Sequence, residues 1–135
     1  QGITLASIVQ RELSCTSGST DCLKNQAMVA QVFYSRLTDG MTLGSDVTFY
    51  YAADKLGVAP STTLDSAYNT RIHAGLPPGP ISAPGAHALN AVASPASTDY
   101  LFFIAGDDGN VYFAHTDAEH QSNVAKYCQK LCSEL

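Results

Sequence analysis

A proline- and glycine-rich segment constrains this 135-residue chain more than any other feature. Residues 58–83 show no regular spacing of apolar side chains, and Gly75-Leu76-Pro77-Pro78-Gly79-Pro80 lies near their end. Proline fixes φ and has no N–H to donate, so neither a helix nor a central strand can form there. The segment predicts a stiff, irregular loop, kept in place by its apolar neighbours. Loops of this length in a compact domain are usually either functional or disordered, and the proline content favours an ordered loop here.

Three helices are expected before the loop, over residues 3–13, about 20–38 and 48–56. In the first two of them apolar residues recur at the helical spacing of three or four. Thr20 or Asp21 can cap the second helix. Gly40 and Gly57 are typical of the position just after a helix end, because glycine adopts a positive φ without strain.

After the loop, Pro84 suits the first turn of a helix that reaches about Ala93. Two apolar runs, 100–105 and 111–114, flank a turn of Asp, Asp, Gly and Asn, which predicts a β-hairpin. Thr116 and Glu119 form a capping box that opens a last helix to about Ser133. The sequence therefore predicts a single α+β domain of about five helices, one β-hairpin and one long Pro/Gly-rich loop.

Composition excludes two classes of protein. The formal net charge is −5 and no cluster of Lys and Arg occurs, so nucleic-acid binding is not expected. No apolar run approaches the ~18–20 residues of a membrane span. The chain begins with Gln1 instead of Met, and we expect it to be the globular piece of a longer protein.

Four cysteines allow three disulfide pairings, and they are Cys15, Cys22, Cys128 and Cys132. In a helix, Cys128 and Cys132 would have Cβ atoms ~5–6 Å apart, whereas a disulfide needs ~3.8 Å. Bridges from the last helix to the Cys15–Cys22 loop are thus expected, with a local Cys15–Cys22 bond as the alternative. Free thiols and a zinc site are weaker alternatives, because the spacings match no common zinc motif. Disulfides would imply an oxidising compartment.

Glu12 is the most informative ionisable residue. At ~100° per residue it falls in the middle of the face formed by Leu5, Ile8 and Val9, while Ser7 is expected to point outward. Burial raises the pKa of a carboxyl group, and a carboxyl group still protonated near neutral pH can act as a general acid. The alternative is a structural glutamate that pairs with Arg36 or accepts backbone N–H groups.

The remaining ionisable residues indicate no metal or cofactor. The four histidines, His73, His87, His115 and His120, lack the spacing of metal ligands and are expected at the surface or as helix caps. Asp46 is expected to cap the third helix. Neither a nucleophile-elbow motif nor a phosphate-binding glycine loop is present in the sequence.

A series of segments, in order along nearly the whole chain, resembles the catalytic domain of endolytic murein transglycosylases, the YceG-like (MltG) family. The segments are Leu5-Ala6-Ser7-Ile8-Val9-Gln10-Arg11-Glu12, Val32-Phe33-Tyr34-Ser35-Arg36-Leu37, Gly44-Ser45-Asp46-Val47-Thr48, Tyr68-Asn69-Thr70, Gly75-Leu76-Pro77-Pro78-Gly79-Pro80-Ile81, Asp99-Tyr100-Leu101-Phe102-Phe103, Glu119-His120 and Asn123-Val124. Tyr68-Asn69-Thr70 and the proline-rich segment 75–81 are the most specific of these segments. Arg71 between them is unusual, and Gly44, Val47, Ser35, Ala83 and Gln10 also depart from the family pattern.

The resemblance implies a lytic transglycosylase that cleaves the β-1,4 bond between N-acetylmuramic acid and N-acetylglucosamine without water. Glu12 would act first as general acid and then as base, and the product would be a 1,6-anhydromuramoyl end. The implied substrate-binding residues are Asp46, Thr48, Tyr68, Asn69, Thr70, Pro78 and Gly79. No cofactor is implied.

The resemblance also implies a place and partners. Residues 1–135 would be the catalytic domain of a protein held by an N-terminal anchor at the extracytoplasmic face of a bacterial membrane. Its substrate would be peptidoglycan strands, and cell-wall synthesis proteins are candidate partners. Two alternatives stay open: a muramidase that uses water with Asp46 as second carboxylate, and a glycan-binding domain without catalysis.

Overall fold

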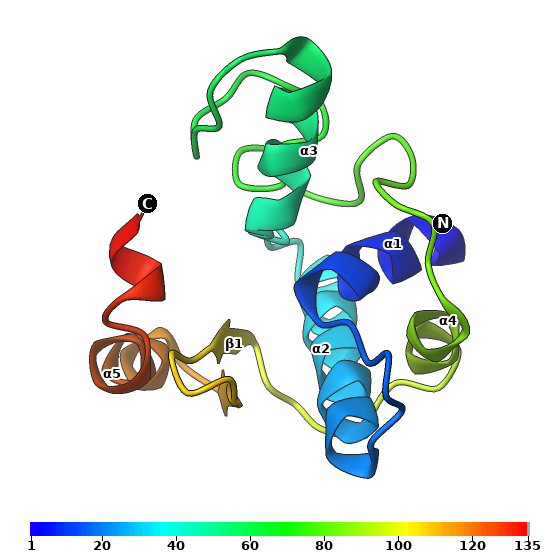
Figure 1. Ribbon diagram of the computed structural model, residues 1–135, viewed down its shortest axis with the longest axis vertical. Coiled ribbons are helices and arrows are strands. Elements are labelled where there is room, and N and C mark those ends of the chain that lie inside the picture. Colours follow the sequence, from blue (N-terminus) through cyan, green and yellow to red (C-terminus); the bar gives the residue numbers. More distant parts are fainter. Residues whose placement is uncertain (135) are drawn as a thin grey trace.

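The computed structural model describes residues 1–134, and over these residues it confirms the predicted α+β class. The elements are α1 Gly2–Glu12, α2 Thr20–Thr38, α3 Asp46–Leu56, α4 Ala86–Ala93, β1 Phe102–Ala105, β2 Val111–Ala114, α5 Asp117–Tyr127 and a 3₁₀ turn at Leu131–Glu134. Figure 1 shows α2 in the centre, crossed by α1, with α4 on one side and the hairpin with α5 on the other. Helix α3 and the long loop extend from one end of this group.

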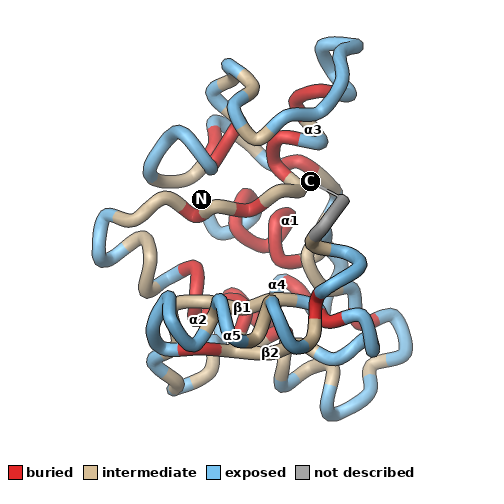
Figure 2. Tube along the Cα trace, turned by 90° about the vertical axis from the view of Figure 1, so that its left-hand side faces the viewer, coloured by how far each residue is buried: buried red, intermediate tan, exposed pale blue. Residues whose placement is uncertain are grey.

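The core lies where α1, α2 and α4 meet. Leu5, Ile8 and Val9 of α1 are buried as the helical spacing predicts, and they pack in one cluster with Val29 and Phe33 of α2. The tube in Figure 2 is correspondingly red along α1. Glu12 is the last residue of α1, so the packing of this short helix decides where Glu12 lies.

Ser7 differs from its expected outward position. It is fully buried, because the Pro/Gly-rich loop covers that face of α1. Its hydroxyl group donates to the Thr4 carbonyl at 2.6 Å and accepts from the Ile81 N–H at 3.0 Å. Ser82 in turn donates to the Ser7 carbonyl at 3.0 Å. The loop is irregular, as predicted, and hydrogen bonds tie it to α1.

Most helix ends agree with the sequence to within two residues. Ser19, one residue before the predicted caps, accepts from the Cys22 N–H at 3.3 Å. Gly40 follows α2 with φ +71° and Gly57 follows α3 with φ +69°. The prediction that Asp46 caps α3 is wrong, since Ser45 holds the cap position and Asp46 is the first helical residue.

The hairpin and α5 form the second part of the domain. β1 and β2 pair in antiparallel register, with Phe103 opposite Phe113. Thr116 caps α5 by accepting from the Glu119 N–H at 3.2 Å, as the capping box predicts. However, α5 ends at Tyr127, about six residues early. Asp107 explains the end, because its carboxylate accepts from the N–H groups of Lys130 and Leu131 at 3.0 Å each.

The disulfides are local, which corrects the preferred pairing. Cys15 bonds to Cys22, and Cys128 bonds to Cys132. The sequence argument against the second bond assumes that both residues lie in one α-helix. Cys128 has instead left α5 with φ −132° and ψ 53°, and the two Cα atoms come within 5.4 Å.

Over residues 1–134, no helix combines the length and the apolar character needed to cross a bilayer.

Candidate active site

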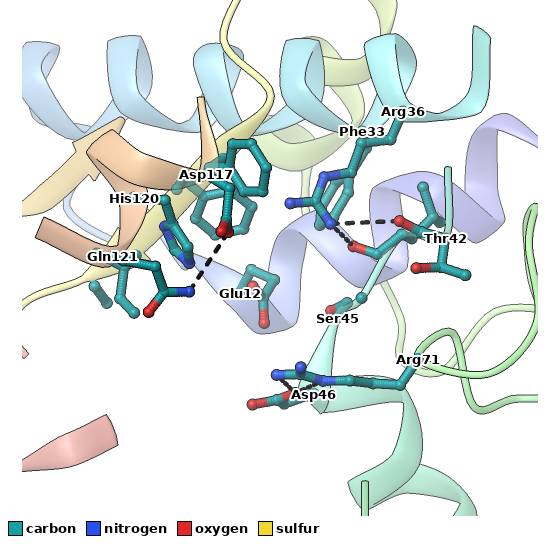
Figure 3. A pocket seen from close by; sticks show the side chains of 16 residues that line it. Glu12, Phe33, Arg36, Thr42, Ser45, Asp46, Arg71, Asp117, His120 and Gln121 are labelled. Atoms are coloured by element: carbon teal, nitrogen blue, oxygen red, sulfur yellow. Dashed lines mark hydrogen bonds and ion pairs between the residues drawn. The ribbon is translucent and has the colours of Figure 1, made fainter. Parts of the chain in front are cut away.

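A cleft of about 470 Å³ opens between α1 and α2 on one side and the β-hairpin with α5 on the other. Residues from α1, α2, the segment before α3, the long loop, β1 and α5 line it. Figure 3 shows Glu12 in its middle, with His120 on one side and Ser45 on the other. The sequence separation of these residues means that only the tertiary fold brings them together.

Glu12 is half-buried at the C-terminal end of α1. Burial, together with the negative charge of Asp46, raises its pKa from 4.5 to about 7. The Ser45 hydroxyl group, Arg71 and Arg36 act in the opposite direction. Among the described residues Glu12 forms no ion pair and accepts no backbone N–H, so the structural alternative for this residue is not supported. A carboxyl group that titrates near pH 7 can both give and take a proton.

Arg36 of α2 braces the cleft instead of pairing with Glu12. Its Nε donates to the Leu101 carbonyl at 2.8 Å, and its Nη1 donates to the Leu43 carbonyl at 2.9 Å. The guanidinium group also lies 5.1 Å from the centre of the Phe102 ring, and burial lowers its pKa. Gly44 has φ +62°, and a Cβ there would lie 3.0 Å from Nη1. This glycine therefore lets residues 42–45, the segment before α3, approach Arg36 closely.

Asp46 and Arg71 form the opposite rim of the cleft. Arg71 Nη2 and Nε lie 2.6 and 2.7 Å from the same oxygen, Oδ1 of Asp46. Asp46 thus lies in the cleft, as the resemblance implies, and is held there by the residue that is unusual for the family.

His120 reaches the cleft from α5. Its ring stacks on Phe102 with 5.1 Å between centres, and its Nδ1 is buried without a hydrogen-bond partner in residues 1–134. Burial and the positive charge of Arg36 lower its pKa, so the imidazole is neutral at pH 7. The sequence alone gave no reason to separate His120 from the other histidines, although it lies in one of the family-like segments.

Three of the implied substrate-binding residues lie beneath the cleft and not on its surface: Thr48, Asn69 and Thr70 are at most 1% exposed. The Thr48 and Thr70 hydroxyl groups lie 2.8 Å apart, and both donate to the Ser45 carbonyl, at 2.6 and 3.2 Å. Asn69 donates to the carbonyls of Thr62 and Leu64 at 3.1 and 2.9 Å. Their polar groups hold the segment before α3 and the long loop in place by these hydrogen bonds.

The other three implied binding residues, Tyr68, Pro78 and Gly79, are also absent from the lining of the cleft. Tyr68 packs on Tyr51 with 5.1 Å between ring centres, and a Cβ on Gly79 would lie 3.3 Å from the Tyr68 hydroxyl oxygen. Pro78 borders a separate hollow beside the N-terminus of α1. The structure therefore brings Asp46 to Glu12 and leaves the rest of the predicted set around or below it.

Fold and site together define a small α+β domain whose cleft is centred on one protonatable carboxyl group. Residues 1–126 match the sequence model of the YceG-like family, and the chain belongs to this family. This confirms the resemblance seen in the sequence.

Relatives with assigned names agree. The chain is 34% identical over 134 residues to an endolytic murein transglycosylase of Streptococcus pneumoniae, covering 93% of this chain and 23% of that protein. It is 36% identical over 128 residues to an endolytic murein transglycosylase of Bacillus subtilis, covering 93% and 34%. A putative yceG-like protein of Listeria monocytogenes has a similar structure, with a TM-score of 0.73 and 38% identity over 90% of this chain and 38% of that one. The chain thus spans about a quarter to a third of its relatives' length.

Proposed function

We propose that this domain is an endolytic lytic transglycosylase of peptidoglycan. The observation that carries the proposal is the cleft position of Glu12 with its pKa of about 7, in a chain whose family relatives are named for this activity. A carboxyl group with that pKa is partly protonated at neutral pH and can begin the reaction as an acid.

In the proposed reaction Glu12 gives its proton to the glycosidic oxygen as the bond from that oxygen to C1 of N-acetylmuramic acid breaks. The resulting carboxylate then takes the proton of the C6 hydroxyl group, and the C6 oxygen forms the new bond to C1. The products are a free 4-hydroxyl end and a 1,6-anhydromuramoyl end, and Glu12 regains its proton. No water is consumed.

The surroundings of Glu12 suit both halves of this cycle. Burial and Asp46 favour the protonated acid that the first half needs. Arg36, Arg71 and Ser45 favour the carboxylate that the second half needs. The balance keeps the pKa close to neutrality, where proton transfer in both directions is efficient.

A water-using muramidase with Asp46 as second carboxylate is the rival enzyme. Arg71 donates from both Nε and Nη2 to Oδ1 of Asp46, so this oxygen is already engaged and is not free to attack C1 or to hold a water molecule. This contact favours the transglycosylase. A non-catalytic glycan-binding domain is the other rival, and it would not need a cleft carboxyl group with a raised pKa.

The test is Glu12→Gln on purified glycan strands, with products identified by mass spectrometry. Wild type should release anhydromuramoyl ends, one water lighter than reducing ends, and Glu12→Gln should release none. Glu119→Gln is the matched control, because Glu119 is exposed and glutamine also serves in a capping box. Reducing ends would identify the muramidase, and binding without cleavage by wild type would identify the glycan-binding domain.

The setting of the activity is part of the proposal. Two disulfides fit an extracytoplasmic, oxidising environment. Peptidoglycan strands are the proposed substrate, and a membrane anchor outside this chain and cell-wall synthesis proteins as partners are proposed from the family resemblance alone. Fractionation of cells that express the full-length protein would test the location.

A further inference from the structure

Ser45 is an N-cap serine that does not cap its helix. It precedes α3, is 3% exposed and lines the cleft. A serine at this position normally accepts a hydrogen bond from a backbone N–H two or three residues later. The Ser45 side chain makes no such bond, and the Thr48 N–H donates to the Ser45 carbonyl at 3.2 Å instead. The Ser45 hydroxyl group is therefore free of its usual structural role.

This hydroxyl group is also unsatisfied. Among the described residues three buried side-chain polar atoms have no hydrogen-bond partner: Ser45 Oγ, His120 Nδ1 and Gln26 Oε1. Only Ser45 and His120 line the cleft, and of these two atoms only Ser45 Oγ acts on Glu12. In Figure 3 the Ser45 side chain lies next to the Glu12 carboxyl group.

The backbone of Ser45 is firmly held. Its N–H donates to Thr70 Oγ1 at 3.0 Å, and its carbonyl accepts from both Thr48 Oγ1 and Thr70 Oγ1. All three groups are buried. A network of this kind keeps the serine in one place at no ordering cost during the reaction.

We propose that Ser45 is a positioning residue for Glu12, whose hydroxyl group donates a hydrogen bond to the carboxylate that forms once Glu12 has given up its proton. The proposal rests on the proposed transglycosylase function. A hydrogen bond to a charged acceptor is stronger than one to a neutral acceptor, so this bond strengthens as the proton leaves. The N-terminus of α3 favours negative charge in the same direction.

Other charged and titratable groups also face the cleft. Arg36 comes from α2, Arg71 from the loop, Asp46 from α3, and Asp117 and His120 from α5. Arg36 and Arg71 favour the carboxylate, whereas Asp46 favours the acid. Ser45 differs from the charged groups because its hydroxyl group is a neutral donor, and unlike His120 it acts on the pKa of Glu12. Its removal therefore changes hydrogen bonding to Glu12 and no charge.

The experiment compares wild type with Ser45→Ala, Ser45→Gly and Ser45→Thr. Carbon-13 NMR of the Glu12 side-chain carboxyl group follows its titration without substrate, and cleavage of glycan strands is measured against pH. Loss of the hydroxyl group should raise the Glu12 pKa and lower the maximal cleavage rate roughly tenfold. Ser45→Thr keeps the hydroxyl group and should restore both. Glycine is well tolerated at an N-cap, so Ser45→Gly guards against a folding defect in the alanine variant.

Ser19→Ala is the matched control, since Ser19 is exposed and does cap its helix through Cys22 N–H. It should lower Tm and leave the Glu12 titration unchanged. If Ser45→Ala and Ser45→Gly also leave that titration unchanged, Ser45 is only structural and the proposal is overturned. Failure of the proposed function would show in a different experiment, as cleavage of glycan strands by the Glu12→Gln variant.

Discussion

Arg71 and Asp46 are joined by two contacts to one oxygen, with Nη2 2.6 Å and Nε 2.7 Å from Asp46 Oδ1. The two residues lie 25 positions apart, in α3 and in the long loop, and both line the cleft at Glu12. Asp46 raises the pKa of Glu12 and Arg71 lowers it. The ion pair is thus a charge balance beside the proposed acid.

We predict that breaking this pair from its two sides moves the pH profile in opposite directions. Asp46→Asn should lower the Glu12 pKa and shift the basic limb of the cleavage profile to lower pH. Arg71→Met removes a positive charge and leaves Asp46 uncompensated, so the basic limb should move to higher pH. Lys55→Met removes an exposed charge at the far end of α3 and should shift nothing. Shifts of the same sign in both variants would contradict this balance.

Glu12→Gln should stabilise the domain at alkaline pH. The folded-state pKa of about 7 lies above the ordinary 4.5, so folding favours the protonated form. This contribution is complete below pH 4.5 and is lost as pH rises to about 7, by at most about 3 kcal/mol. Glutamine stays neutral and avoids the loss. Thermal unfolding should therefore show a higher Tm for the variant at pH 8 and similar values for both proteins at pH 4; equal values at both pH values would argue against a buried charge at Glu12.

Asn69 should prove structural, although the family resemblance implies that it binds substrate. Its amide donates to the Thr62 and Leu64 carbonyls, and its Oδ1 accepts from the Arg71 N–H at 3.0 Å. Asn69→Ala leaves these groups without partners and should cost about 2–4 kcal/mol of unfolding free energy. Denaturant unfolding measures this.

Asn69→Asp tests the same point with a matched shape. A carboxylate can still accept from Arg71 N–H but cannot donate to the two carbonyls, so this variant should be as unstable as Asn69→Ala. Asn90→Ala, on the exposed face of α4, should leave stability nearly unchanged. Weaker glycan binding by a fully stable Asn69→Ala would instead support direct contact with substrate.

The Cys15–Cys22 disulfide should support the site more than the Cys128–Cys132 disulfide. Cys15 is buried three residues after Glu12, and its bond ties the end of α1 to the first turn of α2. The double variant Cys15→Ser with Cys22→Ser should lose about 2–3 kcal/mol of stability by loop closure. Because the loop after Glu12 is then looser, this double variant should also cleave glycan strands more slowly. Cys128→Ser with Cys132→Ser should keep the rate; equal loss of activity in both would show that the first bond has no special link to the site.

The sequence by itself determined the local structure. The apolar spacing of α1, Gly40 after α2, the turn between β1 and β2, and the Thr116 capping box each act within a few residues. Interactions of that range depend little on the rest of the fold. The placement of Glu12 on a buried helix face was predictable for the same reason.

Only the tertiary structure decided the surroundings of Glu12. Arg36, Ser45, Arg71 and His120 come from four separate segments, and no local pattern relates them. The buried side of Ser7 and the early end of α5, which permits the Cys128–Cys132 bond, likewise depend on contacts with Ile81 and Asp107 far away in the chain. The pKa of a carboxyl group is set by burial and by charges that reach it through space, and these exist only once distant segments have packed together.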